Sequence, residues 1–136
     1  MKRIAFSIIC LMTFLVGCQP KSEYEVVAFS GTLTHQGKPL NSQVLITFSP
    51  EKGRSSRAIT DEKGNFKAIY TEKLNGVQKG KSTVTLAPYS SQFQFDNSKS
   101  QVNPELDELI KKYGFGRKGF EIEVTKASSN FKLDLP

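Results

Sequence analysis

Few side chains in this sequence belong to types that perform covalent or metal chemistry. The small number of histidines is the first observation that limits the possible catalytic and metal sites. His35 is the only histidine. A zinc hydrolase needs two or more nitrogen ligands or equivalent thiolates, and the sequence has no H-E-x-x-H motif. A Ser-His-Asp triad would have to use His35, and no G-x-S-x-G motif accompanies it. We therefore predict that the protein is not an enzyme and that His35 is an exposed turn residue.

The acidic segment at 61–65 is the next candidate for a metal site. Asp61, Glu62 and Asn65 carry oxygen ligands, but their spacing is not that of a calcium loop. Asp61 and Gly64 occupy the first and fourth places of a type I turn, where the Asp side chain accepts a backbone amide proton. The sequence thus predicts a turn here, with no metal and no cofactor.

Cys18 has the most specific chemistry in the sequence, because of what precedes it. A basic pair, Lys2 and Arg3, is followed by an almost unbroken apolar run from Ile4 to Val16. This is the layout of a secretory signal, and the run is shorter than the roughly 20 residues of a spanning helix. Residues 1–17 are therefore predicted to be a removed leader. A retained short span, or an ordinary signal that leaves Cys18 as a lone exported thiol, are the alternatives.

The four residues Leu15-Val16-Gly17-Cys18 are similar to the lipobox of bacterial lipoproteins. In that family the cysteine sulfur receives a diacylglycerol, the leader is cut before it, and the new amino group is acylated, for example with palmitate. The resemblance implies that Cys18 is lipidated and holds the protein in the cell envelope. It also implies the outer membrane, because Gln19 is not the aspartate that retains enterobacterial lipoproteins in the inner membrane.

Composition and charge limit the kinds of protein to which the remaining chain can belong. The net charge of +6 is mild and the basic residues are scattered, which argues against a nucleic-acid partner. The two cysteines are Cys10, inside the leader, and Cys18, so no disulfide is expected. Residues 18–25 are expected to form a polar tether, and residues 26–136 a single domain that is stable through packing alone.

Alternating apolar and polar residues predict β-strands through most of that domain. Turn signals rich in Gly, Pro and Asp separate the alternating runs. Seven short strands of this kind predict an all-β sandwich. The expected strands are Val27–Leu33, Val44–Phe48, Arg57–Thr60, Phe66–Tyr70, Ser82–Leu86, Phe120–Val124 and Phe131–Leu135. The side chains expected to share one core are Val44, Ile46, Phe48, Val84, Leu86, Ile122, Val124 and Phe131.

The stretch from Pro88 to Gly119 is too long for a bare connection in a compact domain. Asn103 is a good N-cap and Pro104 suits the first position of a helix. Apolar residues then recur at helical spacing before Gly114, which can end the helix: Leu106, Leu109, Ile110 and Tyr113. One short helix should therefore pack on the sandwich in the long loop before the last two strands.

The same long loop holds the one plausible interaction surface in the sequence. Aromatic side chains beside cations on a loop stack on sugars or bind an acidic partner. The alternative is that these aromatics only cover the open side of the sandwich. The candidate residues are Tyr89, Phe93, Phe95, Lys111, Lys112, Tyr113, Phe115, Arg117 and Lys118.

Several turn-and-strand pieces follow one another in a recognisable order. They are Ser30–Leu33, Gly37–Leu40, Val44–Pro50, Thr60–Phe66, Gly80–Val84, Lys112–Gly114 and Asn130–Leu135. Their order and spacing resemble the carboxypeptidase regulatory-like domain, a transthyretin-like β-sandwich, and more narrowly small bacterial lipoproteins built on it. The resemblance implies an accessory or binding module and no peptidase. Hydroxyisourate hydrolases share that fold but need several histidines and a Y-R-G-S ending, which this sequence lacks.

Two functions remain open from the sequence. The first is a lipid-anchored, non-enzymatic envelope protein that binds an envelope protein or polysaccharide, or serves as a spacer. The alternative is a small-ligand carrier or scavenger of transthyretin-like type, which a pocket lined by polar groups would favour.

Overall fold

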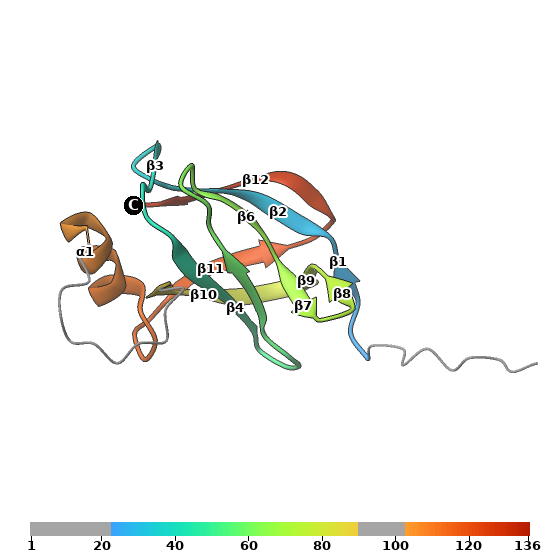
Figure 1. The fold of residues 1–136 in the computed structure, drawn as a ribbon. Helices are drawn as coiled ribbons and strands as arrows, with labels where there is room; N and C mark the ends of the chain where they lie inside the picture. Colours follow the sequence, from blue (N-terminus) through green and yellow to red (C-terminus); the bar gives the residue numbers. More distant parts are fainter. Residues whose placement is uncertain (1–22, 90–102) are drawn as a thin grey trace, which may run out of the picture.

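The computed structural model describes residues 23–89 and 103–136, and Figure 1 shows their arrangement. Within these ranges the chain forms one α-helix and twelve strand segments, most of them paired antiparallel. The predicted all-β class is confirmed in this general form. The predicted leader and Cys18 lie outside the described residues.

The larger sheet has six strands, and every neighbouring pair in it is antiparallel. Its centre is the long pairing of β10 with β4, from Ser82 opposite Pro50 to Pro88 opposite Val44. Alternation along these two strands turns every second side chain into the core. In sheet order the strands are β11 (Phe120–Val124), β10 (Gly80–Pro88), β4 (Val44–Pro50), β5 (Ser56–Ile59), β7 (Ile69–Thr71) and β8 (Leu74–Asn75).

The second sheet is built on β2 (Phe29–His35). β2 pairs in parallel with β12 (Ser128–Leu135), and antiparallel with β3 (Lys38–Pro39) and β6 (Asn65–Lys67). A register shift between Ser128 and Phe131 brings β12 very close to β2. A side chain at Gly31 would collide with the backbone carbonyl of Phe131, so only glycine fits there. A separate pair, β1 (Val26–Val27) with β9 (Val77–Gln78), lies beside these sheets.

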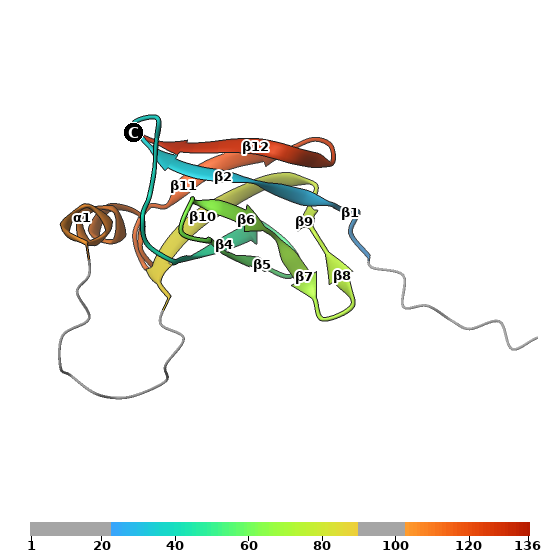
Figure 2. The ribbon, with the colours of Figure 1, turned by 45° about the horizontal axis from the view of Figure 1, so that its top comes forward.

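The two larger sheets face each other across one apolar core, as the layers in Figure 2 show. Phe29 of β2 meets Phe48 of β4 edge to face across the core, with ring centroids 5.9 Å apart. Phe66 and Phe131 join the same ring cluster. The predicted core is confirmed, since seven of its members are buried and Phe131 packs against them while partly exposed.

Two details differ from the predicted strands. The strand count among the described residues is higher than seven, because two-residue pairings such as β1 and β9 are too short to show a sequence period. The single strand expected at Phe66–Tyr70 is two strands, since β6 joins β2 whereas β7 joins β5. The chain changes sheets at Ala68, which is fully buried and donates its N–H to the Phe29 carbonyl. The last two strands likewise lie in different sheets.

The predicted helix is confirmed as α1 (Pro104–Tyr113), which covers one end of the sandwich (Figure 1). The Asn103 side chain accepts the N–H of Glu105, and Pro104 opens the first turn. The helix ends at Gly114, whose N–H donates to the Ile110 carbonyl. Across residues 23–89 and 103–136, no helix has the length and apolar character needed to cross a membrane.

Candidate binding surface

α1 has one buried and one exposed face, so the residues of the predicted interaction surface do not all lie on the exposed side of the domain. Leu106, Leu109 and Tyr113 are buried against the sandwich. The Tyr113 ring meets Phe120 edge to face at 6.2 Å, and its hydroxyl donates to the main-chain oxygen of Pro136 at 3.4 Å. Tyr113 therefore belongs to the core, and its inclusion in an exposed surface was wrong. The helical period that aligns Tyr113 with Leu106 and Leu109 is the signal that places it there.

The two lysines of the last helical turn are exposed but engaged. Lys111 pairs with Asp107 one turn earlier at 2.7 Å, and this hydrogen bond raises the pKa of Lys111. Lys112 donates to the main-chain oxygen of Pro136 at 3.1 Å, and its ammonium lies 5.0 Å from the Tyr113 ring centre. Lys111 thus supports the helix from within and Lys112 ties it to Pro136, which leaves both cations less available to a partner.

The segment after the helix forms a tight turn that presents one aromatic side chain. We call Gly114–Lys118 the Phe115 turn. The Arg117 N–H donates to the Gly114 carbonyl at 3.0 Å, which closes a four-residue turn. Gly116 has φ = 79°, the left-handed value that the third place of a type II turn requires. Phe115 stands at the second place and is 96% exposed.

Two cations follow Phe115 directly, and both are exposed. Arg117 and Lys118 take part in none of the ion pairs between residues that the structure describes. The turn therefore combines a fully exposed apolar ring with two positive charges that form no ion pair with any carboxylate in residues 23–89 and 103–136. Such a combination attracts an anionic surface that can also cover the ring.

The remaining candidates of the predicted surface divide into two groups. Tyr89 follows β10, is 37% exposed, and donates its N–H to the Gln43 carbonyl at 3.3 Å. Phe93 and Phe95 lie outside the described residues. Among the residues of the predicted surface, those of the Phe115 turn and of the exposed face of α1 therefore lie together at one end of the sandwich, where β10 also ends (Figure 1).

His35 is not the exposed turn residue that was predicted. It is the last residue of β2 and is partly buried, and its Nδ1 lies 2.7 Å from Oε1 of Glu105 on α1. Because an ionised carboxylate only accepts hydrogen bonds, Nδ1 carries the proton and donates. His35 therefore ties the helix to β2. This contact joins residues 70 positions apart, so no local sequence pattern could reveal it.

A second carboxylate closes the loop that follows β2. Asp134 of β12 accepts the Thr34 hydroxyl at 2.6 Å and the Gly37 N–H at 2.9 Å through the same oxygen. The Thr34 hydroxyl, with help from Gly37, lowers the pKa of Asp134. These contacts have a structural role at the end of the β2–β12 pair.

The acidic segment at 61–65 forms the predicted turn. Oδ1 of Asp61 accepts the N–H groups of Lys63 and Asn65 at 2.9 and 2.8 Å, and Oδ2 accepts the Asn65 side-chain amide at 3.1 Å. The Asn65 side chain contributes most to lowering the pKa of Asp61. Both carboxylate oxygens are used inside the turn. Within the described ranges, no three His, Cys, Asp or Glu side chains gather in a way that could hold a metal ion.

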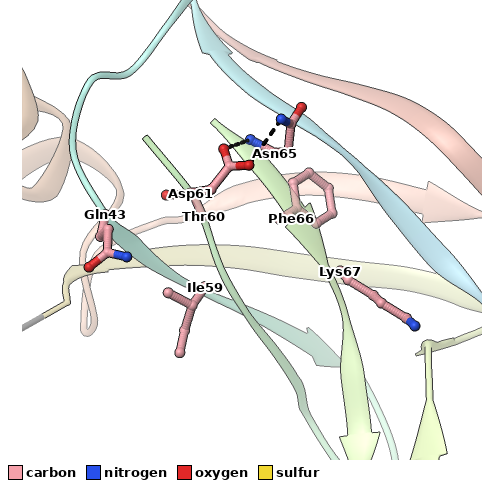
Figure 3. Close-up of a pocket in the computed structure, with 7 residues that line it drawn as sticks. All are labelled: Gln43, Ile59, Thr60, Asp61, Asn65, Phe66 and Lys67. Atoms are coloured by element: carbon pink, nitrogen blue, oxygen red, sulfur yellow. Dashed lines mark hydrogen bonds between the residues drawn. The ribbon is translucent and has the colours of Figure 1, made fainter. Parts of the chain in front are cut away.

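A shallow hollow of about 430 Å³ lies beside this turn, between β5 and β6 (Figure 3). It is open to solvent, and the polar oxygens of Asp61 are already engaged. A site that retains a small ligand encloses most of the ligand surface. This hollow therefore gives little support to a carrier function. The lining residues are Gln43, Ile59, Thr60, Asp61, Asn65, Phe66 and Lys67.

Comparison of the chain with protein families, curated proteins and solved structures gave no match. The exposed Phe115 turn and its two cations are consequently the basis on which a function is inferred.

Proposed function

We propose that the protein is a lipid-anchored, non-enzymatic binding module of the bacterial cell envelope. Lipidated Cys18 is its anchor and the Phe115 turn is its binding point. The observation that supports this most directly is the 96% exposure of Phe115 beside Arg117 and Lys118. Burying one large apolar side chain contributes about 1.5–3 kcal/mol, so a partner that covers Phe115 gains affinity there.

The shape of the sandwich supports a separation between anchor and binding point. The described chain starts at the β1 end of the sandwich, whereas α1 and the Phe115 turn lie at the other end (Figure 1). An extended tether of residues 18–25 reaches roughly 26 Å. An anchor at Cys18 therefore leaves the Phe115 turn free to make a second contact with the envelope.

For the fold we propose the transthyretin-like arrangement of the carboxypeptidase regulatory-like domain. Two facing sheets around a Phe-rich core and the Asp61–Asn65 turn support it. In such domains function depends on loops at the ends of the sandwich. The Phe115 turn is a loop of this kind, which a simple spacer does not need.

The test measures binding of the lipid-free mature chain, residues 18–136 with Cys18→Ser, to purified cell envelope at low and high salt. We expect the variant Phe115→Ser, Arg117→Ser, Lys118→Ser to bind at least about tenfold more weakly, since it loses one apolar anchor and two cations. Its melting curve should be nearly unchanged, because all three side chains are exposed.

The matched control changes one exposed apolar residue and two exposed lysines elsewhere, Ile69→Ser, Lys67→Ser and Lys73→Ser. This control should bind like the unchanged chain. Equal binding by the Phe115 variant, or no binding by any of the chains, would show that the proposed function is wrong.

A further inference from the structure

We propose that the partner of the Phe115 turn is an anionic lipid surface, into which Phe115 inserts while Arg117 and Lys118 contact the headgroups. The inference rests on the proposed function, because it names the partner of the same site. Its consequence is a second point of contact that orients the domain on a bilayer.

The small area of exposed apolar surface at the turn favours a lipid surface over a folded partner. In the described part of the chain, exposed Ile59, Ile69 and Leu74 lie on β5, β7 and β8, and the 37% exposed Tyr89 follows β10 at the same end as the turn. A specific protein interface buries about 800 Å² on each partner, whereas one aromatic side chain supplies about 150–250 Å². A bilayer has no fixed shape to match, and it accepts a single aromatic side chain at the level of its headgroups.

The position of the two cations favours anionic lipid in particular. They lie two and three residues after Phe115, so they come within reach of the headgroups when the ring inserts. The attraction of a cation to an anionic surface fades within a Debye length, about 8 Å at physiological salt. Two carboxylates of α1 are already engaged elsewhere, since Asp107 is paired with Lys111 and Glu105 contacts His35.

The placement of the Phe115 turn allows one bilayer to meet both the anchor segment and the turn. In Figure 1 the start of the described chain and the turn between α1 and β11 lie at opposite ends of the lower margin. Figure 2 also keeps both of them below β2 and β12. Two contacts on one side would lay the long axis of the sandwich along the membrane, with the β2–β12 pair facing away.

The absence of tryptophan from the sequence gives a direct test. Phe115→Trp in the lipid-free mature chain places the only indole at the turn. All core residues lie between Phe29 and Leu135, so this chain keeps the complete fold. Its emission should shift to shorter wavelength with vesicles of phosphatidylglycerol and phosphatidylethanolamine. The shift should fall with added salt, and phosphatidylcholine vesicles should give none.

Three further variants separate insertion from adsorption. Asn130→Trp places the indole at an exposed position of β12, the strand that faces away from the bilayer in this orientation, and should give no shift. Adding Arg117→Ser or Lys118→Ser to Phe115→Trp should lower partitioning by roughly fivefold for each cation removed.

Each outcome decides between the possible partners. If Phe115→Trp does not shift on anionic vesicles while envelope binding still depends on Phe115, lipid is the wrong partner and the proposed function stands with a protein or polysaccharide instead. If envelope binding is also independent of Phe115, both ideas fail. Equal shifts for Phe115→Trp and Asn130→Trp, or for anionic and zwitterionic vesicles, would overturn the insertion.

Discussion

Phe48 and Phe115 show how differently one residue type is used in this molecule. Phe48 is fully buried and lies in a cluster of rings, whereas Phe115 is almost fully exposed. The sequence separates them only in part. Phe48 stands in an alternating strand pattern that predicts burial, whereas Phe115 stands between two glycines, and the sequence left open whether it covered the sandwich or faced solvent.

We expect Phe48→Ala to lower the free energy of unfolding by about 3–5 kcal/mol, because it removes a large buried ring and leaves a cavity. Urea denaturation of the lipid-free mature chain measures the effect. Phe115→Ala is the matched control and should change the free energy by less than about 0.5 kcal/mol. Similar values for the two variants would contradict the placement of Phe48 in the core.

Asp61 and Asp134 make stability sensitive to acid. Hydrogen bonds hold the pKa of both carboxyl groups below the usual range in the folded state. Their contribution to stability is therefore complete above about pH 4 and is lost as the pH falls through the folded-state pKa values. Urea midpoints measured from pH 6 to pH 2 should decline in this acid range.

The variant Asp134→Asn should show a smaller acid decline, because an amide does not take up the proton. Glu62→Gln is the matched control, since its side chain is outside both hydrogen-bond networks. A control that flattens the pH profile as much as Asp134→Asn would rule out this origin.

Among the elements, α1 was the most predictable because its signals are local. An Asn cap, a following proline and an apolar stripe are read within one short stretch. The position of the crossing at Ala68 was not predictable in this way. Phe66, Ala68 and Tyr70 alternate like a single strand, and only distant partners decide that β6 pairs with β2 and β7 with β5.

We expect Asn103→Ala to lower the free energy of unfolding by about 1 kcal/mol, because the first turn of α1 loses the acceptor for the Glu105 N–H. Asn103→Asp should retain most of the stability, since a carboxylate also accepts this bond and suits a helix N-terminus. Thermal denaturation compares the three chains. If alanine and aspartate have equal effects, the cap contributes nothing measurable.

For the whole molecule, the strand alternation predicted an all-β domain with one core, but not its sheet partners. The parallel pairing of β12 with β2 depends on contacts between the two ends of the domain. The candidate site was also predicted only in part, because contacts with distant parts of the chain decide which of its side chains are buried. Arg117 and Lys118 are exposed as expected, Phe115 is exposed where the sequence had left two possibilities open, and Tyr113 follows the helical period into the core.

The anchor remains a prediction from Leu15-Val16-Gly17-Cys18. We expect mass spectrometry of the protein from native membranes to find a mature N-terminus at Cys18 that carries acyl chains. Cys18→Ser should leave the leader uncleaved and the protein without lipid. A mature N-terminus at another residue, or an unmodified Cys18, would contradict the lipoprotein assignment.

The parallel pair of β2 and β12 also has a consequence for how the chain folds. Thr34 and Asp134 hydrogen-bond across this pair although 100 residues separate them in sequence. β2 has only its short partners β3 and β6 until β12 has been synthesised and has docked. A sheet closed by such distant segments forms slowly, because the entropy of a long loop is lost before the contacts are gained. We therefore expect the second sheet of the growing chain to stay open until β12 is available, and a polypeptide in that state can still be threaded through a narrow channel.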